Sequence, residues 1–293
     1  MMIKTFKDLE SLNLSGTKLA VVCPEDKQTL KAVFTAKRNN QVTPILIGDM
    51  DKIKSLIDGD SYKTVIIHHT STPEEASEVA VKMAQKGDVQ SIMKGKVDTK
   101  VLLKSVVKHI KAGKLMSHFV VHELEGYHKL LAMSDGGMNL YPDYEAKMSI
   151  LENSVQALHK LGISSPKVAA LCAVEKVNPK MPETLDAERL KKEHELDCIL
   201  EGPISYDLTM SKKSAEIKGF ESPVCGDADL LLVPNITVGN ILGKSLVYSA
   251  GAKMAGVVLG GKVPVILTSR GSSFEEKYYS ILLSGQLERG SRD

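Results

Sequence analysis

Short apolar runs recur along the chain, and most are followed by a stretch whose apolar positions have helical spacing. Apolar runs that alternate with helices are typical of parallel strands covered by helices on both faces. The sequence therefore predicts an α/β fold. The predicted strands cover residues 18–23, 42–48, 64–69, 91–94, 117–123, 130–133, 167–174, 228–234, 255–259 and 263–267.

Proline and glycine residues mark the ends of several predicted elements. A helix over about 26–38 follows Pro24, and a longer one over about 143–161 lies between Pro142, which suits a helix start, and Gly162, which suits a helix end. The turn-rich segment 134–139 is the best candidate for a crossing between two domains, and a second crossing is expected at 260–262. The predicted domains are 1–134 with 263–293, and 135–262.

The length of 293 residues is consistent with about two domains. Thirty-eight Lys and Arg against 36 Asp and Glu give a net charge of +2, which argues against a nucleic-acid binder driven by bulk charge. Aromatic residues make up only 4%, so a base-stacking platform is not expected.

The four cysteines are scattered and form no C-x-x-C pair, so neither a zinc framework nor a disulfide scaffold is expected. The first residues lack the apolar stretch of a signal peptide, and no apolar run approaches the ~20 residues of a membrane span. We therefore expect a cytoplasmic protein with no membrane partner.

Two familiar motifs fail on spacing. The run 239–245 has one residue too few between its glycines for a P-loop, and no G-x-G-x-x-G follows a predicted strand.

His118 and His122 could share a metal on a helix, but 117–122 is predicted as a strand, where four residues span ~13 Å. We expect them to be ordinary polar positions of that strand.

The C-terminal segment carries the strongest chemical signal. The predicted strand 263–267 runs into the turn 268–273, and a helix begins at about 274. Free N–H groups at a helix start favour phosphate, the Arg270 guanidinium can bind it with two hydrogen bonds, and Ser269 adds a hydroxyl. Glu275 and Glu276 place carboxylates within one turn of this site.

A purely structural interpretation stays open. Ser272 with Glu275, or Ser273 with Glu276, matches a capping box, in which case the glutamates only cap a helix.

A second strand-to-helix segment, 222–240, is weaker evidence for a ligand site. There Gly239 would allow a close backbone approach, Asn240 could cap the helix, and Lys244 follows about one turn later. The alternative is an ordinary connecting loop.

Together these segments resemble the phosphate acetyl/butyryltransferase family. The likeness extends over about residues 15–290. It rests on the glycine loop 93–99, the D-x-G-M-N segment 135–139, an S-P-V-x-G-x-A-D…P…G-N…K pattern and the Ser269-Arg270 turn. The pattern is matched by Ser222, Pro223, Val224, Gly226, Ala228, Asp229, Pro234, Gly239, Asn240 and Lys244.

The resemblance implies reversible acyl transfer between coenzyme A and phosphate, so that acyl-CoA and phosphate are the substrates. It also implies two α/β domains with the site in a central cleft, similar to the isocitrate/isopropylmalate dehydrogenases. A homodimer or higher homo-oligomer is expected, with coenzyme A as a substrate and no metal or redox cofactor.

The family's roles transfer to single residues. The arginine that binds phosphate matches Arg270, and the serine that hydrogen-bonds the reacting centre matches Ser269. The base of the acetyl branch is an aspartate, whereas this chain has Glu276, so Glu275, Glu276 or neither could be the base. Lys104 stands where relatives carry arginine.

The remaining residues that the resemblance assigns to phosphate or coenzyme A binding are Gly95, Gly239, Asn240 and Lys244. The run S-R-x-x-S-x-E-x-K-x-Y-S favours the butyryl or branched-chain branch. It is matched by Ser269, Arg270, Ser273, Glu275, Lys277, Tyr279 and Ser280.

Other interpretations are a phosphate acetyltransferase, a metal- and NAD-dependent dehydrogenase of similar fold, a non-catalytic CoA- or phosphate-binding protein, and an enoyl-CoA hydratase.

Overall fold

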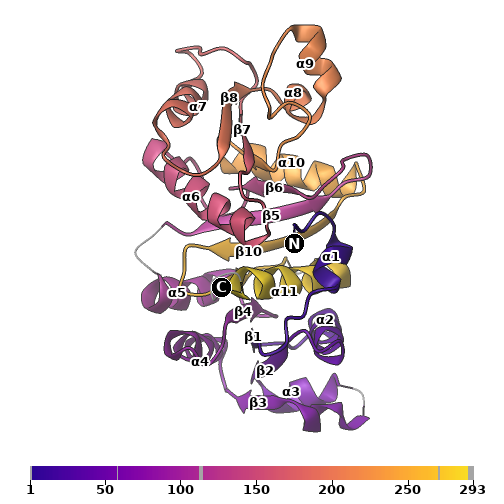
Figure 1. Ribbon diagram of the computed structural model, residues 1–293. Helices are drawn as coiled ribbons and strands as arrows, with labels where there is room; N and C mark the ends of the chain where they lie inside the picture. Colours follow the sequence, from indigo (N-terminus) through magenta and orange to yellow (C-terminus); the bar gives the residue numbers. More distant parts are fainter. Residues whose placement is uncertain (1, 58, 112–114, 270, 290–293) are drawn as a thin grey trace. The chain divides into compact units, whose positions relative to one another are not determined.

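The computed structural model describes residues 2–57, 59–111, 115–269 and 271–289, and its backbone divides into two compact units. Unit 1 comprises the first residues up to Phe6 and Ser117–Lys253, and unit 2 comprises Lys7–Met116 with the chain from Met254 onward. Both units are mixed α/β structures (Figure 1).

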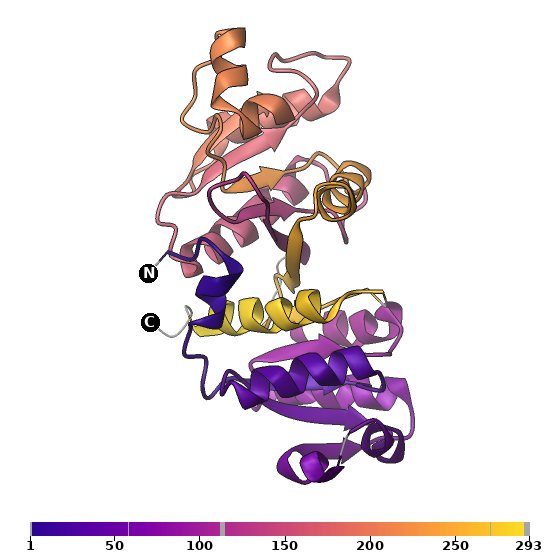
Figure 2. The same cartoon turned by 90° about the vertical axis from the view of Figure 1, so that its right-hand side faces the viewer.

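Unit 2 contains a mostly parallel sheet with the strand order β3-β2-β1-β4-β11-β10. β1 pairs in parallel with β2 and β4, and β11 pairs in parallel with β4. Helices α2 and α11 cover one face and α4 and α5 the other (Figures 1 and 2). The elements are α1 (Phe6–Glu10), β1 (Lys18–Val22), α2 (Lys27–Arg38), β2 (Thr43–Gly48), α3 (Met50–Ser55), η1 (Gly59–Thr64), β3 (Ile66–His69), α4 (Pro73–Lys86), β4 (Ser91–Lys94), α5 (Thr99–Ile110), β10 (Lys253–Leu259), β11 (Val265–Ile266) and α11 (Phe274–Arg289).

Unit 1 contains sheet strands in the order β5-β6-β9-β7-β8, of which β6, β9, β7 and β8 are parallel. Helices α6 and α7 pack together, and α10 packs against β6 (Figure 1). The elements are β5 (Ser117–Glu123), β6 (Leu131–Ser134), α6 (Tyr144–Lys160), β7 (Lys167–Leu171), α7 (Pro182–Glu193), β8 (Ile199–Ile204), α8 (Tyr206–Met210), α9 (Lys212–Lys218), β9 (Leu230–Leu232) and α10 (Ile236–Tyr248).

The continuous apolar runs are buried as the pattern predicts. Every residue of β4 and of β9 is buried, because helices cover both faces of these central strands. Two pairs depart from the parallel prediction: β5 with β6, and β10 with β11, are antiparallel. Each pair is joined by a short connection, which cannot hold the crossover that a parallel pair needs.

The divisions between the units differ from the expected domain boundaries. The segments 134–139 and 260–262 were the predicted crossings, but each lies inside one unit, and the chain divides after Met116 and after Lys253. The physical reason is strand pairing: β6 hydrogen-bonds to β9 in unit 1, and β10 to β11 in unit 2.

Helix α6 shows how local sequence sets an element boundary. The Asp143 side chain accepts a hydrogen bond from the Ala146 N–H at 2.9 Å, so Asp143 is the N-cap and Pro142 lies just outside the helix. Leu161 is the C-cap, and Gly162 follows with φ of 87°, in the left-handed conformation that glycine favours.

Candidate active site

The carboxyl ends of the parallel strands in unit 2 meet at one edge of its sheet. Cys23 follows β1, Gly95 follows β4, and Thr268 and Ser269 come shortly after β11. Since β1, β4 and β11 are neighbours in the sheet, the glycine loop and the Ser269 turn lie at the same edge. Open α/β sheets bind ligands at this edge.

The turn between β11 and α11 is linked by hydroxyl groups. Ser269 Oγ lies 3.1 Å from Ser272 Oγ, and Ser272 Oγ donates to Glu276 Oε1 at 2.6 Å. Ser273 Oγ accepts a hydrogen bond from the Glu276 N–H at 3.1 Å. The structure thus joins Ser269 to Glu276 through Ser272, a residue that the sequence analysis considered only as a helix cap.

The capping-box interpretation holds for one half only. Ser273 caps α11, but the Glu276 carboxylate turns to the Ser272 hydroxyl instead of completing the box. Glu276 is half-buried, and burial raises the pKa of its carboxyl group above the usual range. Glu275 is exposed to solvent. The environment therefore favours Glu276 over Glu275 as a proton acceptor.

A buried lysine connects the start of the same turn to helix α11. Lys277 Nζ donates to Thr268 Oγ1 at 3.0 Å, and both side chains are buried. Burial lowers the pKa of Lys277, because the charged ammonium is poorly solvated there. This contact ties the last residues before the turn to the first turn of α11. The sequence analysis names Lys277 only as one position of the S-R-x-x-S-x-E-x-K-x-Y-S run and does not predict this contact.

Gly95 allows two backbones to pack closely. Its N–H donates to the Val22 carbonyl at 2.8 Å, and the Lys96 N–H donates to the Cys23 carbonyl at 2.7 Å. A Cβ atom on Gly95 would lie 2.2 Å from the Cys23 oxygen. The glycine therefore has a structural reason in this fold, and its part in ligand binding stays a prediction.

Gly95→Ala is expected to destabilise the protein by at least about 3 kcal/mol, which lowers Tm by roughly 10 °C, because backbone atoms of a central strand cannot move away. Thermal unfolding of the purified variant checks this. Gly261→Ala is the control, since its nearest contact would be an ordinary 3.4 Å. Equal Tm values for the two variants would contradict the close packing of Gly95.

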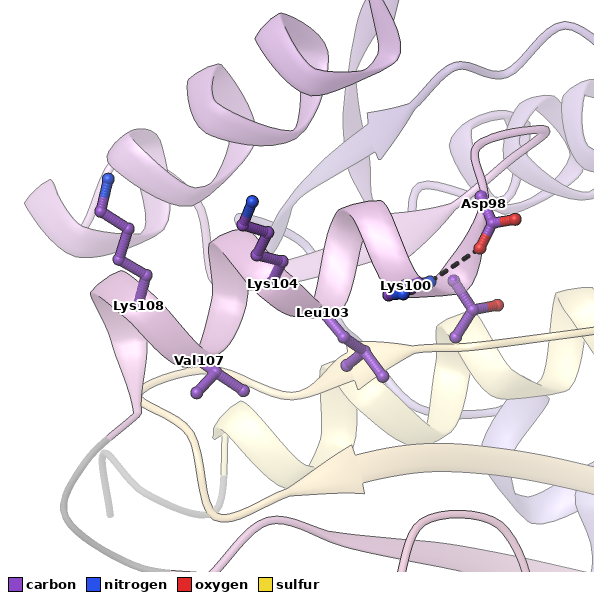
Figure 3. A pocket seen from close by; sticks show the side chains of 7 residues that line it. Asp98, Lys100, Leu103, Lys104, Val107 and Lys108 are labelled. Atoms are coloured by element: carbon purple, nitrogen blue, oxygen red, sulfur yellow. Dashed lines mark hydrogen bonds between the residues drawn. The ribbon is translucent and has the colours of Figure 1, made fainter.

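Lys104 lies on α5 with Lys100 and Lys108, one helical turn before and after it. These lysines and their neighbours line a hollow of about 750 Å³, in which Lys104 and Lys108 point to one side of the helix and Leu103 and Val107 to the other (Figure 3). Asp98 caps α5 by accepting from the Lys100 N–H at 2.9 Å. Lys104 is exposed, so its charge is available to a phosphate.

The segment after β6 in unit 1 is organised by one buried carboxylate. Asp135 accepts hydrogen bonds from the backbone N–H groups of His118 at 3.0 Å, Gly137 at 2.8 Å and Met138 at 2.9 Å, and from Asn139 Nδ2 at 2.6 Å. Only 2% of Asp135 is exposed. The conformation of the D-x-G-M-N segment is therefore stabilised by hydrogen bonds to the buried Asp135 carboxylate.

Helix α10 packs on this loop. A Cβ atom on Gly239 would lie 2.7 Å from Gly136 Cα, and Asn240 Nδ2 donates to the Gly136 carbonyl at 3.2 Å. Asn240 is not the helix cap, because the helix already begins at Ile236 with Asn235 as its N-cap. Gly239 and Asn240 thus lie within α10 and contact the Asp135 loop, and Lys244 is exposed farther along it.

The two histidines of β5 are more buried than expected. His118 and His122 lie on a strand, as the sequence predicts, but His122 is fully buried, and neither of its ring nitrogens has a hydrogen-bond partner within the described residues. Burial lowers the pKa of His118 and lowers that of His122 to about 4. Both rings are therefore neutral at pH 7.

This burial predicts a loss of stability as the pH falls. The unfolded chain takes up a proton on His122 below about pH 6.5, whereas the folded protein resists it down to about pH 4, which costs about 3 kcal/mol over that interval. His122→Leu should weaken this pH dependence in urea unfolding. The exposed His68→Gln variant should leave it unchanged, and a slope unaltered in His122→Leu would contradict the burial of a neutral imidazole.

Arg270 lies outside the described residues, so its predicted role is untested by the structure. In the parts that are described, no group of three or more His, Cys, Asp or Glu side chains is placed to hold a metal ion. No helix among those parts combines the length and hydropathy needed to cross a membrane.

Comparisons with known proteins agree over nearly the whole chain. A family model described as phosphate acetyl/butaryl transferase matches residues 61–284. The phosphate butyryltransferase of Clostridium acetobutylicum is 38% identical and covers 97% of this chain and 98% of its own length. The phosphate acetyltransferase of Thermotoga maritima is 39% identical, with 95% and 97% covered.

Two solved structures resemble this chain over most of its length. The crystal structure of a branched-chain phosphotransacylase from Enterococcus faecalis V583 matches with a TM-score of 0.85 at 30% identity, covering 93% of this chain and 99% of that one. A 4-hydroxythreonine-4-phosphate dehydrogenase from Klebsiella pneumoniae matches with a TM-score of 0.57 at 12% identity, covering 94% and 100%, which is a likeness of fold alone.

Proposed function

Because this chain belongs to the phosphate acetyl/butaryl transferase family, we propose that it transfers a butyryl or branched short-chain acyl group reversibly between coenzyme A and phosphate. The observation that carries this proposal is similarity over nearly the full length to a phosphate butyryltransferase. The likeness to a branched-chain phosphotransacylase supports the same substrate class.

The chemistry requires a base and groups that bind an anion. A free cysteine thiol titrates at about pH 8.5, so an alkyl thiol such as that of coenzyme A is mostly protonated at neutral pH, and a base must remove its proton before it attacks an acyl phosphate. Glu276 suits this role, because its raised pKa brings it closer to the operating pH while Ser272 holds its carboxylate. No atom changes its oxidation state in the reaction, so no redox cofactor is needed.

Ser269 is placed to hydrogen-bond the reacting centre. It is exposed at the carboxyl edge of the unit 2 sheet, one hydroxyl away from the Ser272–Glu276 pair. In the family's pattern Arg270 binds the phosphate. The tetrahedral intermediate of acyl transfer carries an oxyanion that such donors stabilise.

Phosphate and coenzyme A binding is assigned to a further group of residues. Lys104 supplies an exposed positive charge on α5, and Lys244 supplies one on α10. Gly95 acts by letting its loop pack tightly, and Gly239 and Asn240 act by holding the loop of Asp135.

A phosphate acetyltransferase is the second candidate. It is favoured by the relative from Thermotoga maritima, whose identity to this chain of 39% equals or exceeds that of the butyryltransferases. The two candidates share the reaction and differ only in the acyl group.

The fold class, the location, the oligomeric state and the partners are part of the same proposal. The fold belongs to the isocitrate/isopropylmalate dehydrogenase-like class of two α/β domains, an assignment supported by the likeness in fold to a 4-hydroxythreonine-4-phosphate dehydrogenase. The protein works in the cytoplasm as a homodimer or a higher homo-oligomer, without nucleic acid or membrane partners.

The direct test measures thiol release from acetyl-, butyryl- and isobutyryl-CoA, each with and without phosphate. Phosphate-dependent release that is fastest with the four-carbon substrates is expected. Fastest release with acetyl-CoA would favour the second candidate, and phosphate-independent release or none would contradict both.

A further inference from the structure

The hydrogen bonds around Ser272 have a direction that follows from counting protons. A serine hydroxyl has one proton, and Ser272 donates its proton to the Glu276 carboxylate at 2.6 Å. At the 3.1 Å contact between the two serines, Ser272 must therefore accept, and Ser269 must donate. The protons point from Ser269 through Ser272 to Glu276.

This direction leaves the lone pairs of Ser269 as acceptors toward the outside. Ser269 is exposed, Ser272 is only 6% exposed, and Glu276 is half-buried. The chain of hydrogen bonds thus runs from an accessible hydroxyl at the edge of the sheet to a half-buried carboxylate. A donor that hydrogen-bonds to Ser269 has a continuous path for its proton to Glu276.

We propose that Ser272 is a positioning residue that couples Ser269 to Glu276 and through which Glu276 takes the proton of the coenzyme A thiol. This proposal rests on the proposed function. When the thiol S–H bond breaks, its proton moves to Ser269 Oγ, the Ser269 proton moves to Ser272 Oγ, and the Ser272 proton moves to Glu276. Both serines end neutral, Glu276 becomes a neutral acid, and the thiolate keeps the electron pair with which it attacks the acyl carbon.

The reverse reaction uses the same path. When the thiolate leaves the tetrahedral intermediate, the proton on Glu276 returns through Ser272 and Ser269 to the sulfur. In acyl-CoA synthesis the phosphate departs with one proton fewer than the hydrogen phosphate that is released, so it takes the proton from Glu276 and the carboxylate is restored. In the reverse direction the attacking hydrogen phosphate gives this proton to Glu276.

The charges around Glu276 set its response to a change at Ser272. Lys277 on the same helix lowers the pKa of Glu276, as does the hydrogen bond from Ser272, although burial outweighs both. The charged side chains that the packed elements bring to this end of α11 are Lys31, which lies over the Phe274 ring, Asp26, which interacts with Lys277, and the buried Lys94 at the end of β4. Removing the Ser272 hydroxyl therefore raises the pKa of Glu276 further.

The test compares Ser272→Thr with Ser272→Val, a pair with nearly the same shape that differs by one hydroxyl, together with Ser272→Ala. Ser273→Ala is the matched control, since Ser273 only caps α11 in the same turn. We expect Ala and Val to lower kcat for butyryl phosphate and CoA by about 10²-fold, with KM values within about threefold, and Thr to retain most of the activity. The acid limb of the pH profile should move to higher pH in the Ala and Val variants, which lack the hydroxyl, and not in the Thr variant or in Ser273→Ala.

Ser273→Ala should lower Tm modestly without lowering kcat. Equal activity of the Thr and Val variants, or a loss in Ser272→Ala no larger than in Ser273→Ala, would overturn the coupling. If the Ser272 variants fail to fold, the wild-type rate in mixtures of H₂O and D₂O decides: transfer of several protons gives a curved dependence, and a linear one would overturn the relay. Wild-type enzyme without phosphate-dependent thiol release would instead refute the proposed function itself.

Discussion

Glu276→Gln is expected to lower kcat by about 10³-fold while leaving the KM values for coenzyme A and acyl phosphate nearly unchanged. The amide has the shape of the carboxyl group but cannot accept a proton at neutral pH. A Gln amide can donate to the Ser272 hydroxyl as well as accept from it. The direction of the hydrogen bonds in the turn is then no longer determined. Steady-state kinetics in the direction of acyl-CoA synthesis measure both constants.

Glu275→Gln gives the matched comparison, because it makes the same change one residue away on an exposed side chain. We expect its kcat to stay within about threefold of the wild-type value, as for a surface substitution without a contact to the site. A larger loss in Glu275→Gln than in Glu276→Gln would reverse the assignment of the base. The resemblance to the family left these two glutamates undecided, whereas their burial separates them.

Asp135→Ala is expected to destabilise the protein by about 3–5 kcal/mol, a large part of a typical total of 5–15 kcal/mol. The substitution removes the acceptor for four hydrogen bonds, three of them from backbone N–H groups, in a site that is 2% exposed. Donors left unpaired in such a place lose their hydration without compensation. Urea unfolding followed by circular dichroism measures the change.

Asp143→Ala is a suitable comparison for this change. Asp143 also accepts from a backbone N–H, but it lies at the start of α6 and is exposed, so its loss is expected to cost about 1 kcal/mol. Similar decreases in the free energy of unfolding of the two variants would mean that the buried Asp135 carboxylate does not stabilise its loop. Because α10 packs on this loop through Gly239 and Asn240, Asp135→Ala should also raise KM for coenzyme A or phosphate.

Most of the strands could be predicted from apolar runs, because central parallel strands are buried on both faces. β4 and β5 have the predicted bounds, and α2 and α6 begin where Asp26 and Asp143 cap them. β8 was missed because Glu201, Gly202 and Pro203 interrupt its pattern. The antiparallel pairs and the limits of the units depend on which strands pair, which local pattern does not determine.

The candidate site could be predicted only as a set of residue types. The hydroxyls and carboxylates of 269–276 are evident in the sequence, but spacing alone fits a capping box as well as an active site. The structure adds the rotamer of Glu276, which reaches Ser272, and the burial that distinguishes it from Glu275. Asn240 was expected to cap a helix that in fact starts four residues earlier, since Asn235 provides the competing cap.

The most direct measurement follows the phosphorus resonances of a mixture of butyryl-CoA, inorganic phosphate and the purified enzyme. An acyl phosphate signal that grows in proportion to the free thiol released, and that falls again when coenzyme A is added, is the predicted result. Thiol release without an acyl phosphate signal would show hydrolysis instead of transfer to phosphate, and it would contradict the proposed acyltransferase.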